Sequence, residues 1–260
     1  LPAPLLTQAA SLLDRDGYPK LAISVDARSA HNLSSLPQQI EVLRSSGRDF
    51  RLLYLEAQDE TLIRRYSETR RSHPLSQGTL TISECIQLER QILGEIREVG
   101  HVIDTTGLSA RQLHRWIREV VALDRSRLTV IFESFGFKHG LALDADFAFD
   151  ARCLPNPFYE IPLRPLTGLD APVIEFLQSH SQVGLFGEDI RTLLERWLPI
   201  FEQDQRSYVT VAIGCTGGQH RSVYLAEQLG RHFQTRWQVL VRHRELAQIS
   251  HAQTGESHPG

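Results

Sequence analysis

Short apolar segments typical of β-strands alternate with longer segments of helical character along most of this chain. In the first half, the predicted strands are residues 20–25, 51–55 and 101–104. The predicted helices are residues 6–14, 36–45, 59–71, 83–99 and 109–123. Strands that alternate with helices pair as a parallel sheet whose faces the helices cover. The pattern therefore predicts an α/β protein.

A second series of strands and helices follows the polar run at residues 124–127. Its predicted strands are residues 128–137 and 208–214, and its clearest helix is residues 223–233. The end of the chain is polar and rich in Gly, Pro and Ser, which predicts a disordered tail. The sequence therefore predicts two domains and a tail, at residues 1–126, 127–247 and 248–260.

The composition is that of an ordinary globular protein. Of the 260 residues, 41% are hydrophobic and 23% are charged, close to the soluble average. No run approaches the roughly 18 uncharged apolar residues of a membrane span, so no membrane partner is expected. The formal net charge of −3 gives no bulk signal for nucleic acid. Cys85, Cys153 and Cys215 are too few for a disulfide framework, which favours a reducing cytoplasm.

The segment GCTGGQHRS at residues 214–222 carries the strongest chemical signal. An apolar strand runs into a glycine-containing loop and then into a helix, so free backbone N–H groups and the positive helix end meet at one place. Gly217 and Gly218 permit the backbone angles of a tight amide nest. Arg221 can clamp an oxyanion with two hydrogen bonds, and His220 can donate another. The loop is therefore predicted to cradle a phosphate.

The same loop fits the C-x5-R-S pattern of cysteine-dependent phosphatases. In those enzymes the amide nest and the arginine stabilise a thiolate that attacks phosphorus, roles that would fall to Cys215 and Arg221. Gly214 stands where such enzymes usually carry His. The alternative interpretation is that Cys215 is a small buried residue at a strand end.

Charged residues cluster after the first strand of the second series. Lys138, one of two lysines in the chain, can pair with a phosphate. Asp144, Asp146 and Asp150 can bind hydroxyl groups, an amine or a metal, or can serve as helix caps and ion-pair partners. For Asp150, an ion pair with Arg152 is favoured.

The first half carries weaker signals of nucleotide chemistry. Asp26 ends an apolar strand, as does the aspartate that holds magnesium in P-loop NTPases. The predicted helix at 59–71 resembles the arginine-bearing lid of nucleoside monophosphate kinases, although a solvated charged helix has the same pattern. The motif G-x-x-x-x-G-K-[ST] is absent from this sequence, which also has no Met. We therefore expect a preceding N-terminal segment, and weak nucleotide binding without it.

Several segments together resemble the RapZ/YvcJ family of bacterial P-loop nucleotide-binding proteins. They are VDARS, LEAQDETLIRRYSETRRSHPL, VIDTTGLS, SFGFKHGLALDADFAFDARCLPNPFY, LRPLTGLD and AIGCTGGQHRSVYLAEQL. The resemblance runs from the start of the chain to about Leu246. It implies an incomplete N-terminal P-loop kinase-like domain with a parallel sheet, and a C-terminal α/β domain that resembles phosphofructokinase.

The resemblance also implies a function. The family's C-terminal domain senses glucosamine-6-phosphate and binds small regulatory RNA, which is presented to ribonuclease E so that amino-sugar synthesis falls. Its N-terminal domain binds ATP or GTP with magnesium and hydrolyses them slowly. We therefore expect a cytoplasmic regulatory adapter that forms homo-oligomers and is at most a slow NTPase, with no catalytic residue assigned and no cofactor needed at the C-terminal site.

The residues and the resemblance together give three groups of expected site residues. The phosphosugar site is expected to comprise Cys215, Thr216, Gly217, Gly218, His220, Arg221, Asp150, Arg152, Asn156 and Lys138. The nucleotide site is expected to comprise Asp26, Arg28, Arg64 and Arg71, with Asp26 holding magnesium when a P-loop is present. The RNA contacts are expected to be Arg231, Arg236, Arg242 and Arg244.

The sequence departs from the family in three places. The family's P-loop precedes the first residue here. A C-terminal basic cluster of the enteric members is replaced by residues 245–248, ELAQ, and Phe158 stands where some relatives carry His. Affinity that rests on phosphate contacts falls when basic groups are lost, so RNA binding would depend on oligomerisation to multiply the patch.

Two alternatives to the regulatory adapter stay open. One is a P-loop NTPase or phosphotransferase that acts on a small phosphorylated substrate through the first half, where Arg65 and Arg70 would assist. The other is a cysteine-dependent phosphatase.

Overall fold

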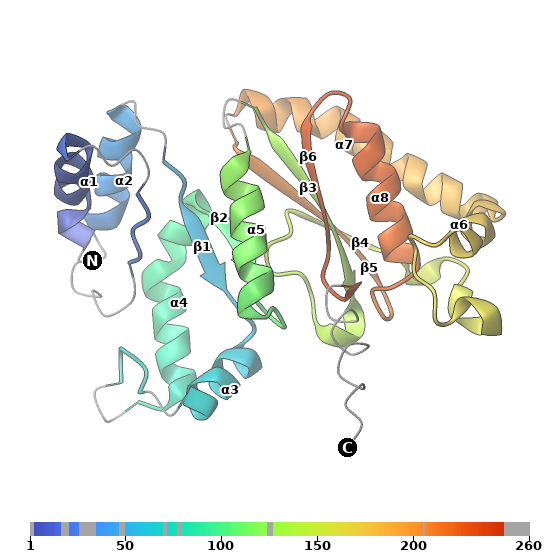
Figure 1. Ribbon diagram of the computed structural model, residues 1–260, viewed down its shortest axis with the longest axis horizontal. Helices are drawn as coiled ribbons and strands as arrows, with labels where there is room; N and C mark the ends of the chain where they lie inside the picture. Colours follow the sequence, from blue (N-terminus) through green and yellow to red (C-terminus); the bar gives the residue numbers. More distant parts are fainter. Residues whose placement is uncertain are drawn as a thin grey trace, which may run out of the picture. The chain divides into compact units, whose positions relative to one another are not determined.

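The computed structural model divides into two units, one before and one after the Gly107–Leu108 bond (Figure 1). It describes residues 3–16, 21–25, 35–46, 50–69, 72–76, 80–123, 127–204 and 206–246. The predicted tail at 248–260 lies outside these residues. Helix 110–122 belongs to the second unit, whereas the domain boundary predicted from sequence lies at its far end, between residues 126 and 127.

The first unit contains one parallel strand pair and four α-helices among its described residues. Strand β1 (Leu53–Glu56) pairs in parallel with β2 (His101–Asp104). The helices are α1 (Leu6–Arg15), α2 (Leu36–Ser45), α3 (Asp59–Thr69) and α4 (Ile82–Val99). Apolar side chains of α1, α2 and α4 form its core, with Leu6, Ile40 and Ile96 buried there.

Helix α4 begins where a capping box forms. The Thr81 hydroxyl accepts from the backbone N–H of Glu84, and the Glu84 carboxylate accepts from the N–H of Thr81 at 2.8 Å. The backbone N–H groups of Thr81 and Glu84 would otherwise lack hydrogen-bond partners at the start of the helix. The predicted start at Ser83 was therefore one residue late, because Thr81 is the cap and the helix begins at Ile82.

The predicted strand at 20–25 was wrong over its described part, residues 21–25, which have no regular secondary structure. Ile23 and Val25 still turn toward the core of the first unit, while Leu21 and Ser24 are exposed. The alternation is that of a strand, but a strand also needs a hydrogen-bonded neighbour. Within the part of the chain that is described, β1 pairs only with β2.

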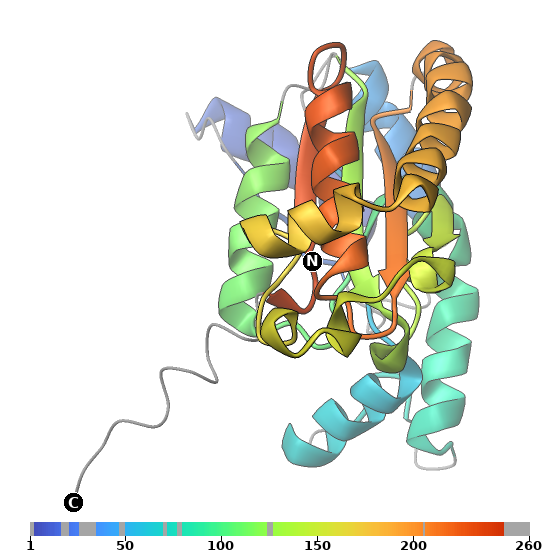
Figure 2. The same ribbon diagram turned by 90° about the vertical axis from the view of Figure 1, so that its right-hand side faces the viewer.

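The second unit is built on a four-stranded parallel sheet in the order β4-β5-β3-β6. Its strands are β3 (Thr129–Gly136), β4 (Phe147–Asp150), β5 (Tyr208–Cys215) and β6 (Gln238–His243). Its α-helices are α5 (Ala110–Ala122), α6 (Ala171–Gln178), α7 (Ser181–Gln203) and α8 (Arg221–Phe233). Figures 1 and 2 show α5 on one side of the sheet and α6, α7 and α8 on the other. The predicted α/β architecture is confirmed.

The core of the second unit lies between β3, β5 and the helices α7 and α8. All eight residues of β3 are buried, as expected for a central parallel strand covered on both faces. Phe132 stacks on Phe233 of α8, with ring centroids 5.6 Å apart. Among the described residues, no helix is long and apolar enough to cross a membrane.

Leu194→Ala is expected to lower the free energy of unfolding by about 2 to 5 kcal/mol, because Leu194 of α7 is fully buried and its loss leaves a cavity. Leu193→Ala is the matched control, since its side chain is 37% exposed and should cost less than about 1 kcal/mol. Urea unfolding of both variants measures the difference. Equal losses would contradict the packing of α7 on the sheet.

Candidate functional site

The site lies where β3 and β5 end. The two strands pair in register up to Gly136 and Cys215, so the segments that follow them leave the sheet at the same edge. One of these segments, residues 216–220, is called the nest loop here. It joins β5 to the N-terminus of α8. The predicted strand–loop–helix arrangement is confirmed.

The nest loop has the tight backbone that its glycines predicted. Gly218 has φ +72°, a conformation that side chains with a Cβ rarely adopt. A Cβ there would also lie 2.7 Å from the backbone nitrogen of Gly136 and would clash with the Glu245 carboxylate. Glycine is therefore required at this position.

His220 holds the nest loop to the rest of the unit. Its Nε2 lies 3.1 Å from the carbonyl oxygen of Leu163, and the carbonyl of Gln219 accepts from the N–H of Gly168 at 2.8 Å. Burial lowers the pKa of His220, which favours the neutral ring. The Leu163 carbonyl engages one ring nitrogen, and donation from His220 to an oxyanion stays a prediction.

Arg221 is a buried cation, only 4% exposed. Its Nη1 donates to the carbonyls of Arg152 and Leu154 at 3.0 and 2.9 Å, and its Nη2 donates to the Thr216 hydroxyl at 3.3 Å. Its Nε has no hydrogen-bond partner, and no described carboxylate forms an ion pair with it. Arg221 helps to lower the pKa of the Asp150 carboxyl but forms no ion pair with it. Burying a cation without a direct ion pair is costly. The position therefore favours an anionic ligand.

Lys138 brings a second cation to the nest loop. Its Nζ lies 3.9 Å from the point where a Cβ of Gly217 would stand, and its backbone N–H donates to the carbonyl of Thr216 at 3.3 Å. Both Lys138 and Thr216 are exposed. The outer side of the loop is thus open to solvent and positively charged.

Cys215 contributes its sulfur to the interior of the nest. The buried Sγ accepts from the N–H of Gly218 at 3.2 Å and lies 3.2 Å from the Ser222 hydroxyl. The Gly218 N–H of the nest loop is therefore already hydrogen-bonded to the Cys215 sulfur.

Asp150, Arg152 and Asn156 serve mainly as structural partners of one another and of the backbone. Arg152 forms an ion pair with Asp150 at 2.7 Å, as predicted, and this hydrogen bonding lowers the pKa of the Asp150 carboxyl. The Arg152 guanidinium also lies 3.9 Å from the centre of the Phe137 ring. Asn156 accepts from the N–H of Phe158 at 3.4 Å. The Asp150 carboxylate and the Asn156 side-chain oxygen thus have local partners, and their role at a sugar stays a prediction.

The other two acidic candidates are also ion-paired. Asp146 contacts Arg206 at 2.9 Å, and Asp144 contacts Arg242 at 3.5 Å. The interpretation of these carboxylates as ion-pair partners is therefore confirmed. Among the described ranges, no group of three or more His, Cys, Asp or Glu side chains is arranged to hold a metal.

The predicted RNA contacts fall into two classes. Arg231 has a 66% exposed side chain, and Arg236 is exposed beside Trp237. Arg242 and Arg244 are buried and lie 3.5 and 3.6 Å from the Glu133 carboxylate. Their burial and their ion pairs with Glu133 do not favour contact with a phosphate backbone, and their role as RNA contacts stays a prediction.

Of the predicted nucleotide residues, Arg64 is described, with an exposed side chain 4.0 Å from Glu68. Its neighbour Arg65 donates to the Thr105 carbonyl at 2.7 Å. Asp26, Arg28, Arg70 and Arg71 lie outside the described residues.

Glu245 is a site residue that the sequence did not indicate. Its buried carboxylate lies against Gly218, and its Oε2 has no hydrogen-bond partner within the described chain. Burial raises the pKa of Glu245 to about 7, against the opposing effect of the nearby Arg244. No local motif marks it, since it reaches the nest loop from the segment after β6.

Because the folded-state pKa of Glu245 is raised from 4.5 to about 7, the folded protein binds its proton more tightly than the unfolded chain does. The contribution to stability is thus complete below pH 4.5 and is lost as the pH rises to about 7. Over this pH window, the free energy of unfolding of the wild type should fall by up to about 3 kcal/mol relative to that of Glu245→Gln. Urea unfolding at several pH values measures it, and a pH-independent difference between the two proteins would contradict the assignment.

Comparison with known proteins agrees with this architecture. Residues 1–125 match the sequence profile of the RapZ-like N-terminal domain, and residues 128–247 match that of the RapZ C-terminal domain. Proteins named "Nucleotide-binding protein" from Chromobacterium violaceum and Thiobacillus denitrificans are 54% and 53% identical to it. Each match covers 95% of this chain, and 88% and 89% of the respective relative. This chain therefore belongs to the RapZ family.

Proposed function

We propose that the second unit binds a phosphorylated amino sugar, glucosamine-6-phosphate, at the nest loop. The observation that carries this proposal is the buried Arg221 guanidinium, which has no carboxylate partner among the described residues. A phosphate dianion at the loop would supply the missing negative charge, with Lys138 on the solvent side. Backbone N–H groups at the start of α8 would add hydrogen bonds.

The proposal extends to the whole protein as a regulatory adapter. Relatives of this chain are named nucleotide-binding proteins, and we propose that this protein binds ATP or GTP with magnesium through its first unit. Arg64 is exposed there, with its guanidinium 4.0 Å from the Glu68 carboxylate. We further propose a cytoplasmic homo-oligomer that binds a small regulatory RNA and presents it to ribonuclease E, in response to the amino sugar.

Titration calorimetry of glucosamine-6-phosphate tests the sugar site. Lys138→Ala is expected to weaken binding roughly tenfold, because it removes one charge-assisted contact from an exposed position. Arg221→Ala should weaken it further. Arg196→Ala is the matched control, since Arg196 is an exposed arginine on α7 and should leave affinity unchanged.

Two further ligands test the two parts of glucosamine-6-phosphate separately. Glucose-6-phosphate lacks the amino group, and free glucosamine lacks the phosphate. Tight binding of glucose-6-phosphate would identify the loop as a general phosphate nest and overturn amino-sugar selectivity. Unchanged affinity in both Lys138→Ala and Arg221→Ala would overturn the site assignment.

The thiol geometry favours one second candidate, phosphatase activity. The Gly218 N–H and the Ser222 hydroxyl lie within 3.2 Å of the Cys215 sulfur, and such contacts stabilise a thiolate nucleophile. If the loop is a phosphatase site, an aryl phosphate should be hydrolysed by the wild type and spared by Cys215→Ser. Equal background rates in the two proteins would end this candidate.

A further inference from the structure

Glu245 brings a carboxylate to the buried side of the nest loop from a distant segment of the chain. It lies two residues after β6 and is only 3% exposed. A Cβ on Gly218 would stand 2.7 Å from the Glu245 Cδ and 2.7 Å from the backbone nitrogen of Gly136. The carboxylate is therefore packed against the place where the nest loop meets the end of β3.

The arginines beside Glu245 in the sequence are paired with other carboxylates. Arg242 lies 3.5 Å from Glu133 and 3.5 Å from Asp144, and Arg244 lies 3.6 Å from Glu133. These two cations and two anions balance each other. The Glu245 Oε2 has no hydrogen-bond partner within the described chain. An ionised Glu245 thus adds one uncompensated negative charge to a buried cluster, which is costly.

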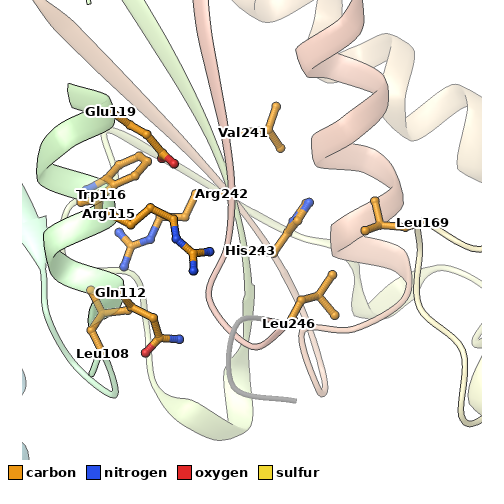
Figure 3. A pocket seen from close by; sticks show the side chains of 10 residues that line it. All are labelled: Leu108, Gln112, Arg115, Trp116, Glu119, Leu169, Val241, Arg242, His243 and Leu246. Atoms are coloured by element: carbon orange, nitrogen blue, oxygen red, sulfur yellow. The ribbon is translucent and has the colours of Figure 1, made fainter. Parts of the chain in front are cut away.

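The direction of the Arg242 side chain fits this arrangement. It points from β6 toward α5 (Figure 3), where its guanidinium lies 4.9 Å from the centre of the Trp116 ring. A pocket of about 330 Å³ opens between α5 and the end of β6. Arg242 and Leu246 line it, whereas Glu245, which stands between them in the sequence, is not one of its described lining residues. The Glu245 carboxylate therefore adjoins the nest loop rather than this pocket.

Ionisable groups surround Glu245 on the strands and loops packed against it. Besides Asp144, they are Glu133, Lys138, His139, Cys215, Arg242 and Arg244. Burial and the nearby charges of Lys138 and Arg244 lower the pKa of His139, which favours the neutral ring. Burial raises the pKa of Glu245 to about 7, against the opposing effects of Arg244 and Arg242. The Glu245 carboxyl therefore changes its charge close to neutral pH.

The nest loop offers two cations to an anionic ligand. Arg221 and Lys138 form no direct ion pair with a carboxylate of the described residues. A phosphate monoester carries close to two negative charges above about pH 7, which these two cations balance. An ionised Glu245 beside Gly218 would leave the occupied site with one excess negative charge, and like charges repel strongly in buried surroundings. The occupied nest is balanced when Glu245 is neutral.

We propose that Glu245 is a specificity-determining residue of the nest loop, which binds a phosphate monoester dianion together with one proton held on the Glu245 carboxyl. This assignment rests on the proposed phosphate site and makes its affinity depend on pH. As the pH rises, the free protein loses the proton, and binding of the dianion then takes one up from solvent. A singly charged anion is balanced with Glu245 ionised, so the pH dependence distinguishes dianions from monoanions.

Titration calorimetry of the full chain near pH 6 and near pH 8 compares the wild type with Glu245→Gln, which keeps the shape of the side chain and fixes it neutral. The two proteins should bind glucosamine-6-phosphate equally at about pH 6, and the wild type should bind roughly tenfold more weakly at about pH 8. Ionisation of the ligand's own groups is common to both proteins and cancels. Glu175→Gln, which changes an exposed carboxylate on α6, is the matched control and should follow the wild type.

Sulfate is a second probe, because it stays a dianion over this whole range of pH. Its binding to the wild type at about pH 8 should take up about one proton. The uptake is measured as the difference in binding enthalpy between two buffers of unequal ionisation enthalpy. This measurement needs only the wild type, so it holds even if Glu245→Gln fails to fold. Uptake that persists in Glu245→Gln and disappears in Cys215→Ser would place the proton on the thiol and overturn the assignment.

The remaining outcomes separate the role of Glu245 from the proposed site. Equal pH dependence in the wild type and Glu245→Gln, or sulfate binding without proton uptake, would overturn the role of Glu245 and leave the phosphate site standing. If neither glucosamine-6-phosphate nor sulfate binds at about pH 6, where Glu245 is neutral, the proposed site fails and the role of Glu245 with it. Proton-linked sulfate binding without binding of the amino sugar would refute the sugar assignment and support the role of Glu245.

Discussion

The parallel, in-register pairing of β3 with β5 is the constraint on which the rest of the second unit depends. It brings Gly136 opposite Cys215, so the segments carrying Lys138 and the nest loop leave the sheet together. A Cβ on Gly136 would lie 2.7 Å from the carbonyl carbon of Gly217. This close approach of two backbones is possible only because Gly136 carries no side chain, and it brings together the groups of the proposed anion site.

Charge balance distinguishes structural cations from functional ones in this unit. Glu133 is fully buried and neutralises Arg242 and Arg244, so these arginines hold β6 and its following turn against β3. Arg221 is as deeply buried, yet its contacts are carbonyls and a hydroxyl. The same residue type thus occurs in two settings, with a direct carboxylate ion pair at Arg242 and Arg244 and without one at Arg221.

Strand β6 and the segment that follows it link α5 to the nest loop. Arg242 contacts Trp116 of α5, and three residues later Glu245 lies against Gly218 of the nest loop. A titratable carboxylate with a pKa of about 7 at this point makes the local charge of the nest sensitive to pH near neutrality. A phosphate bound there would lie beside a negatively charged Glu245 carboxylate above that pH and a neutral one below it.

The sequence alone determined the features that depend on neighbours along the chain. The α/β class, the strand–loop–helix of residues 208–233 and the Asp150–Arg152 ion pair are all of this kind, because propensity, glycine backbone freedom and short side-chain reach act over a few residues. The tertiary structure decided what requires distant partners. Residues 21–25 carry a strand pattern without a described strand neighbour. Arg242 and Arg244 are buried and form ion pairs with Glu133. Glu245 reaches Gly218 from the segment after β6. Burial and pairing are set by which segments the sheet brings together, and no local pattern encodes that choice.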